Sequence, residues 1–409
     1  MGRIAVVAAL LLAVCAAAAP AGTEPERVYA VSESQLAEVD ARTLKPVSSA
    51  RVELATLGLW SFSPDGKTLA VSNGWVPRSG VARPVQLRFV DLVKLRLTGS
   101  VRLGPDPGLT TGYIDPVVLV SWITKDTIVA IKQADGRLEL AGVDYGKQTI
   151  RWRRPLSGVV LASAAVGGEL VLLVGKVGQI AAPRILVVDA RGRVRSAELG
   201  RLRAGWSWDQ VQTPPVGETR RPGLAVDSAT KTAYVAAPSG LVAEVALDGL
   251  GVRYHALRGT LAKYQSGAER QAVSLGGGML AVAGSNSAVE KSDGKLYQVT
   301  RASGLELVDT RMGTTRSINT TATAVATWHG GLVSASRSWD SRVSQQRGGG
   351  LAIYDRAGVL QARLLEGRSV SLVGVRGDLA YAYDGDRITV DLVAREVIGR
   401  GAKAFPLLR

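Results

Sequence analysis

The chain has 409 residues, of which 46% are apolar and 21% charged, and this composition excludes a disordered chain. A single Cys excludes a disulfide scaffold, and only two His leave little scope for histidine-based metal or acid–base chemistry. Fifty Lys and Arg stand against 35 Asp and Glu, and the resulting net charge of +15 points to anionic partners.

The first predicted element is a targeting segment at residues 1–21. Arg3 precedes an unbroken apolar run at residues 4–14, and small residues with an A-x-A pattern at 19–21 follow it. This order is typical of a secretory signal peptide, and the apolar run is too short to cross a bilayer. We therefore expect a secreted, periplasmic or cell-envelope protein, in which residues 22–27 form a short linker.

Cys15 does not predict lipid anchoring, because Val14 stands where a bacterial lipobox has a small residue. No later apolar run approaches the length of about 18 residues that a transmembrane helix requires. The rest of the chain, residues 28–409, is expected to form a single domain and to be monomeric.

The chain after residue 27 shows the two-residue periodicity of β-strands and no helical periodicity. One unit recurs about every 50 residues, and its second strand, rich in Ala and Val, pairs with a third strand that ends near an acidic residue. The predicted hairpins are 28–32 with 35–40, 68–72 with 86–91, 127–131 with 138–144, 170–175 with 185–189, 232–236 with 241–248, 279–283 with 305–309, 332–336 with 351–355, and 379–383 with 387–392.

Repeated four-stranded units of this size are the signature of a β-propeller, because each small sheet must bury its faces against its neighbours around an axis. We therefore predict an all-β fold, a β-propeller of four-stranded blades, eight by count with seven as the alternative. Two packed β-sandwiches are the other architecture considered. The first unit lacks an innermost strand, and residues 404–408 can supply that strand and close the ring.

Residues 63–67, with the sequence SPDGK, lie between two predicted strands and suit a type I turn. In this setting they resemble the inner turn of WD40-like, TolB-like and YVTN-type propeller repeats. Residues 28–32 followed by 36–40 are similar to the YVTN repeat, which ends in a V-x-D strand. The resemblance implies a secreted bacterial propeller over residues 28–400. It leaves function open, because such propellers serve as binding platforms, assembly factors and enzymes.

Five long insertions are expected as loops on one face of the propeller, since each joins two units or follows a second strand. They are residues 73–86, 176–184, 201–221, 284–303 and 337–347. Together they carry a net charge of +9 and half of the Trp residues. Arg forms bidentate contacts with carboxylate and phosphate, and exposed Trp offers a flat platform. The predicted binding residues are Trp75, Arg78, Arg83, Trp206, Trp208, Arg220, Arg221, Arg337, Trp339 and Arg342.

The predicted function is non-enzymatic binding or scaffolding, with an anionic envelope polymer or an acidic protein as partner. A nucleic-acid partner is not expected, because no recognised motif accompanies the charge. The alternatives are an envelope assembly factor and a propeller enzyme of the lyase, lactonase or quinone-dependent dehydrogenase type with a central-channel site. The spacing of Asp144 and Trp152 resembles a quinone-dependent repeat, but it occurs once.

No catalytic residue, metal ligand or cofactor is assigned. His255 and His329 are predicted on separate elements that do not meet. The Asp residues at strand ends recur with the repeat, which indicates turn capping rather than acid–base chemistry. Residues 384–386, Asp-Gly-Asp, offer too few ligands for a calcium loop and are expected to form a hairpin turn.

Overall fold

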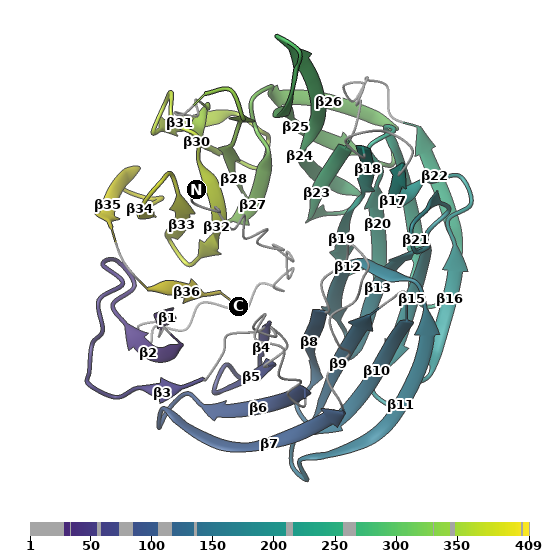
Figure 1. The fold of residues 1–409 in the computed structure, drawn as a ribbon, viewed down its shortest axis with the longest axis vertical. Helices are drawn as coiled ribbons and strands as arrows, with labels where there is room; N and C mark the ends of the chain where they lie inside the picture. The colour runs from purple at the N-terminus through teal and green to yellow at the C-terminus, as the bar shows by residue number, and fades with distance from the viewer. Residues whose placement is uncertain are drawn as a thin grey trace.

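The computed structural model describes residues 28–32, 34–54, 59–72, 85–104, 117–134, 137–209, 216–256, 267–329, 331–343, 348–401 and 404–408. Every secondary-structure element in these ranges is a β-strand. The strands form eight sheets arranged in a ring (Figure 1), which we number 1 to 8 in chain order. The predicted all-β propeller is therefore confirmed.

Seven of the sheets have four strands, and sheet 6 has eight. Sheet 1 contains β3 (Val52–Glu53), β2 (Gln35–Val39), β1 (Val28–Ser32) and β36 (Phe405–Leu407); sheet 2 contains β4 (Trp60–Phe62), β5 (Thr68–Ser72), β6 (Val85–Asp91) and β7 (Arg96–Gly104); sheet 3 contains β8 (Val117–Thr124), β9 (Thr127–Ala134), β10 (Arg137–Asp144) and β11 (Thr149–Ser157); sheet 4 contains β12 (Val159–Val166), β13 (Glu169–Gly175), β15 (Arg184–Asp189) and β16 (Val194–Glu198).

Sheet 5 contains β19 (Gly223–Asp227), β20 (Thr232–Ala236), β21 (Leu241–Ala246) and β22 (Val252–Ala256); sheet 6 contains β14 (Ile180–Ala181), β17 (Ala204–Asp209), β18 (Val216–Arg221), β23 (Gly267–Gly276), β24 (Met279–Ser292), β25 (Lys295–Asp309), β26 (Thr314–Asn319) and β29 (Trp339–Asp340); sheet 7 contains β27 (Ala324–Trp328), β28 (Gly331–Ser336), β30 (Gly350–Tyr354) and β31 (Leu360–Leu364); sheet 8 contains β32 (Ser371–Arg376), β33 (Leu379–Tyr383), β34 (Arg387–Asp391) and β35 (Glu396–Arg400). Seven of the sheets are blades of four strands, and four strands of sheet 6, β23–β26, fill the remaining place in the ring.

The hydrophobic core lies between the sheets and not at the centre of the ring. In the described residues the buried apolar side chains form eight clusters, one at each junction between neighbouring sheets. Ile131 and Leu172, for example, meet between sheets 3 and 4, and both are fully buried. All eight predicted hairpins are present as antiparallel pairs. Several strands of these hairpins, such as β5, β20 and β30, are buried at every position, and because successive side chains point to opposite faces, both faces of the sheet are buried.

The two ends of the described chain meet in sheet 1, where β36 pairs antiparallel with β1. This is the closing strand expected at residues 404–408. Leu407 is fully buried in the cluster between sheets 1 and 2, and the ring of Phe405 packs edge-on against Trp60. The ring is thus closed by a strand from the opposite end of the chain.

An Asp ends the third strand in seven sheets and caps the turn that follows it. In sheet 2 the Asp91 carboxylate accepts hydrogen bonds from the backbone amides of Val93 and Lys94, at 2.9 and 3.0 Å. The other six are Asp40, Asp144, Asp189, Asp309, Asp355 and Asp391. These contacts confirm the turn-capping role that the repeat pattern predicts.

Arginine side chains join neighbouring sheets by donating hydrogen bonds to backbone carbonyl oxygens. Six of the eight junctions in the described residues have such a contact. The donors and acceptors are Arg88 to Leu54, Arg153 to Leu103, Arg154 to Gly192, Arg195 to Leu247 and Asp248, Arg316 to Ala357, Arg356 to Leu275, and Arg395 to Gln361. We call these contacts arginine clasps. These contacts explain part of the excess of basic over acidic residues, because an Arg that donates to a backbone carbonyl needs no Asp or Glu as its partner.

At the junction of sheets 8 and 1, Arg42 forms an ion pair with the buried carboxylate of Asp391. The pKa of Asp391 lies below its usual value, mainly because the backbone amide of Ala394 stabilises the carboxylate, while burial acts in the opposite direction. The amide of Val393 and the charge of Arg42 add to this lowering.

A lowered pKa in the folded state means that the Asp391 carboxylate stabilises the fold above its unfolded-state pKa of about 3.9. This stabilisation is lost as the pH falls through the folded-state pKa. We expect Asp391→Asn to lower the urea midpoint at pH 7 and to have a much smaller effect near pH 3. Urea titrations of both proteins across this range test the point. An equal difference at both pH values would show that the carboxylate charge is not involved.

Candidate functional site

Four of the five segments predicted as loops contain short strands. These strands pair with one another and form an added part of sheet 6. Its strand order is β14, β17, β18, the first residues of β23, the outer halves of β24 and β25, and β29. We call this part, residues 180–181, 204–209, 216–221, 267–269, 285–302 and 339–340, the accessory sheet. The expectation of loops at 176–184, 201–221, 284–303 and 337–347 is therefore wrong for the described parts that form β14, β17, β18, β24, β25 and β29, because these strand edges satisfy one another's backbone groups.

The outer halves of β24 and β25 form a hairpin that extends beyond the blade. Its turn is Asp293-Gly294, and both residues have positive φ angles, of 51° and 74°. A two-residue Asp-Gly loop between alternating strands is a strong hairpin signal. This signal in the sequence could have shown that residues 284–303 are two strands, and it would have revealed Lys291, Ser287 and Thr300 as part of the site.

The register of the accessory sheet places six residues in one line across its strands. Trp206 pairs with Thr219, Thr219 with Gly267, Gly267 with Ser287, Ser287 with Thr300, and Thr300 with Trp339. Directly paired residues point to the same face of a sheet. We call this line the Trp row and its side of the sheet the Trp-row face. Two predicted binding residues, far apart in sequence, thus end a single row.

A second line of evidence places the middle of the Trp row on one face. A β-carbon added to Gly267 would lie 3.4 Å from Cβ of Ser287. The hydroxyl groups of Ser287 and Thr300 are 3.1 Å apart and hydrogen-bonded. The side chains of Trp206, Thr219, Ser287, Thr300 and Trp339 are all half-buried. The row is therefore a floor of small side chains with an indole at each end.

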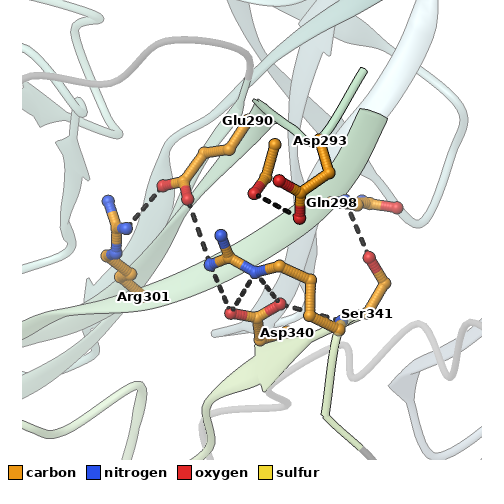
Figure 2. A network of polar contacts seen from close by, with 8 residues as sticks. Glu290, Asp293, Gln298, Arg301, Asp340 and Ser341 are labelled. Carbon is orange, nitrogen blue, oxygen red and sulfur yellow. Dashed lines mark hydrogen bonds and ion pairs between the residues drawn. The ribbon is translucent and has the colours of Figure 1, made fainter. Parts of the chain in front are cut away.

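The opposite face of the accessory sheet holds its carboxylates, and we call it the carboxylate face. The Arg220 guanidinium contacts Glu218 at 2.7 Å. Figure 2 shows Glu290 facing Arg301. The guanidinium of Arg342 contacts Glu290 at 3.1 Å and Asp340 at 2.6 Å.

The contacts of Arg342 change the acid–base behaviour of its partner. Hydrogen bonds from Arg342 hold the pKa of Asp340 below its usual value, and the carboxylates raise the pKa of Arg342. The same guanidinium lies 5.7 Å from the centroid of the Tyr297 ring. Two hydrogen bonds between the backbone and side chain of Ser341 and the backbone of Gln298 fix the segment in place (Figure 2). The guanidinium of Arg342 is thus held by contacts to side chains of the same chain.

The predicted site residues divide into three groups. Trp206, Arg221 and Trp339 lie on the Trp-row face, and Arg337, two residues before Trp339, is exposed. Arg220 and Arg342 have intramolecular carboxylate partners on the carboxylate face. The remaining predicted residues, Trp75, Arg78, Arg83 and the side chain of Trp208, lie outside the described residues.

Charge is divided unevenly between the two faces. On the Trp-row face the described strands carry Arg221 and Lys291, with Glu269 as their carboxylate. Arg221 and Glu269 are 3.3 Å apart, and both side chains are about half exposed. Lys291 is exposed near the hairpin turn. Lys291 is therefore an exposed cation on the side of the two indoles, and Lys295 is an exposed cation on the carboxylate face.

The residues considered for catalysis are engaged in structural contacts. His255 bonds to Glu244 at 2.8 Å on the outer strand β22, and His329 bonds to Asp378 at 2.6 Å at a turn. Trp152 donates to the carbonyl of Ala190 in sheet 4 at 3.0 Å, so it joins two sheets. In the described part of the chain no group of three or more His, Cys, Asp or Glu side chains is placed to hold a metal ion.

The Asp-Gly-Asp segment at residues 384–386 forms the turn between β33 and β34. The carboxylate of Asp384 is fully buried and contacts Arg368 at 3.0 Å and Arg400 at 3.1 Å. Both guanidinium groups contact the same carboxylate oxygen, Oδ2 of Asp384, which would otherwise be a possible calcium ligand. The segment is a hairpin turn, as expected from its sequence.

The sequence matches no protein-family model and no curated protein. Similar solved structures include AztD from Citrobacter koseri, at 12% identity and a TM-score of 0.50, covering 93% of this chain and 97% of that chain. BamB from Moraxella catarrhalis has 14% identity and a TM-score of 0.48, covering 88% and 92%. The periplasmic gluconolactonase PpgL from Pseudomonas aeruginosa has 16% and 0.46, covering 83% and 96%. At such identities the similarity shows the propeller fold alone.

Among the residues that the structure describes there is no helix with the length and hydrophobicity needed to span a membrane. The narrower resemblance to secreted YVTN and TolB-like repeats stays a prediction.

Proposed function

We propose that this protein is an exported, non-enzymatic binding propeller that holds an anionic ligand on the Trp-row face of the accessory sheet. The ligand class is an acidic envelope polymer or an acidic protein. Export follows from the signal-peptide pattern at residues 1–21, which lies outside the described residues.

The observation that carries the proposal is the separation of charge across one sheet. Glu218, Glu290 and Asp340 are on the carboxylate face, where they neutralise arginines of the same segments. The other face carries the two indoles, the exposed Lys291, and Arg221 with a single carboxylate, Glu269, as its partner. A cationic surface with aromatic platforms favours ligands that combine negative charge with a flat surface.

A salt gradient on immobilised polyglutamate tests the proposal. The test variant carries Arg221→Gln, Lys291→Gln and Arg337→Gln, and the control carries Arg96→Gln, Arg137→Gln and Arg191→Gln, three exposed arginines elsewhere on the ring. Both variants lose three positive charges, so they differ only in position. We expect the test variant to elute at clearly lower salt than the wild type, and the control to elute close to it.

Equal shifts for the two variants would show that retention depends on total charge, and the proposal would be wrong. The proposal would also be wrong if the wild-type protein is not retained on the column at low salt. Thermal unfolding of all three proteins checks that the substitutions leave the fold intact. Exposed charge substitutions of this kind change stability by about 0.5 kcal/mol or less.

A further inference from the structure

The hairpin of β24 and β25 ends in a turn of two exposed residues, Asp293 and Gly294. Both residues have left-handed backbone conformations. In the described part of the chain, a β-carbon added to Gly294 would meet no atom within 4 Å. The turn is therefore an Asp-Gly sequence at an exposed tip, and this combination has a chemistry of its own.

An Asp that precedes Gly can react with the backbone of the same chain. The amide nitrogen of the Gly attacks the carbon of the protonated side-chain carboxyl group, and the carboxyl hydroxyl leaves with the amide proton as water. The product is a five-membered succinimide ring. Water then opens the ring at either carbonyl group, which gives Asp again or isoaspartate, whose backbone runs through the side chain. Gly favours the reaction because it has no β-carbon beside the attacking nitrogen.

The described structure contains four Asp-Gly pairs, and two of them hold the carboxylate in place. The Asp65 carboxylate accepts hydrogen bonds from the hydroxyl of Ser63 at 2.6 Å and from the amide of Lys67 at 3.1 Å. The Asp384 carboxylate is fully buried between its two guanidinium partners. Neither side chain can turn toward the next backbone nitrogen without breaking these contacts.

The other two pairs differ in how firmly they are held. Asp248 contacts the ammonium group of Lys231 at 3.1 Å, and its backbone carbonyl accepts a hydrogen bond from Arg195 at 2.6 Å. The Asp293 carboxylate contacts the hydroxyl of the neighbouring Ser292 at 3.4 Å. Among the four Asp residues, Asp293 alone has a positive φ angle, which is an unfavourable conformation for a residue with a β-carbon. Asp293 is therefore the least restrained of the four.

The place of the turn in the fold also favours reaction. The pair of Ser292 with Lys295 is the last of the hairpin, and end pairs of this kind open at a small cost in free energy. Opening lets the Asp293 side chain approach the nitrogen of Gly294. The Asp-Gly pairs at 65–66, 248–249 and 384–385 lie instead in turns of the ring itself.

We propose that Asp293-Gly294 is a modification site, at which the folded protein converts Asp293 to isoaspartate without an enzyme. The conversion adds one carbon atom to the backbone of a two-residue turn. The pairs of Ser292 with Lys295 and of Lys291 with Leu296 then lose their register. This inference goes beyond ligand binding, because it assigns a covalent change to the tip of the hairpin.

Incubation of the folded protein at neutral pH for several weeks tests the inference. Trypsin places the four pairs on four different peptides, residues 52–67, 232–253, 292–295 and 377–387. Chromatography separates the aspartyl and isoaspartyl forms of each peptide, and electron-transfer fragmentation identifies them, since their masses are equal. We expect the isoaspartyl fraction of peptide 292–295 to exceed that of each other peptide by about fivefold or more.

Two controls separate the fold from the local sequence. In concentrated urea the four peptides should convert at rates within about twofold of one another, because the contacts that restrain the other three are lost. Asp293→Glu should abolish the signal at 292–295, since Glu would have to form a six-membered ring. The matched variant Asp248→Glu should leave that signal unchanged.

Equal conversion of the four pairs in the folded protein, or no conversion at 292–295, would overturn the inference. The same preference for 292–295 in urea would also overturn it, because the local sequence and not the structure would then select the site. None of these readouts involves a ligand. The modification site and the anion-binding face can therefore fail independently.

Discussion

Replacing Leu407 with Ala is expected to lower the free energy of unfolding by about 2–5 kcal/mol, although only two residues follow it in the sequence. Leu407 is fully buried between sheets 1 and 2, in the strand that joins the last part of the chain to the first. The substitution leaves a cavity between sheets 1 and 2, next to the pairing of β36 with β1 that closes the ring. Chemical denaturation followed by Trp fluorescence measures the effect.

Leu360→Ala is the matched control, because Leu360 is 43% exposed on the outer strand β31. We expect it to change the free energy of unfolding by about 0.5 kcal/mol or less. Similar small effects for both variants would show that β36 does not close the ring in solution. A large effect at Leu407 alone would show that β36 packs into the core between sheets 1 and 2 in solution.

The propeller itself could be predicted from the sequence because its hairpins are local. Each pairs strands joined by short connections within one repeat, and the Asp after the third strand marks the same turn in seven sheets. Apolar alternation in two adjacent strands then specifies which faces are buried. The closing strand at residues 404–408 followed from the one unit that lacked a partner.

The accessory sheet could not be predicted in the same way, since its strands come from four separate segments of the chain. The parallel contact of β18 with β23 sets the register of the whole Trp row, and no local pattern specifies it. The hairpin at Asp293-Gly294 had a recognisable signal, but the two-residue strand β29 did not. Residues predicted together as one basic site were therefore divided between two faces.

The excess of Arg has a structural use that sequence counting does not reveal. A guanidinium that donates to a backbone carbonyl needs no acidic partner, so a ring joined by arginine clasps becomes basic without any anionic ligand. Arg195 makes two such carbonyl contacts in addition to one acidic contact. It donates to the carbonyl oxygens of Leu247 and Asp248 in sheet 5, at 2.7 and 2.6 Å, and to Glu169 at 2.7 Å. The net charge therefore overstates how many cationic side chains are available to bind a ligand.

Arg195→Met tests this use of Arg, because Met keeps most of the side-chain volume and removes every donor. We expect the free energy of unfolding to fall by about 1–3 kcal/mol, since three acceptors at the junction of sheets 4 and 5 lose their partner. Arg191→Met is the control on the same turn, where the side chain is exposed and only the backbone amide bonds to Asp189. Both variants lose one positive charge, so a difference in their denaturation midpoints measures the clasp and not the charge. Equal midpoints would mean that water replaces the guanidinium at this junction, and the basic composition would then need a functional explanation.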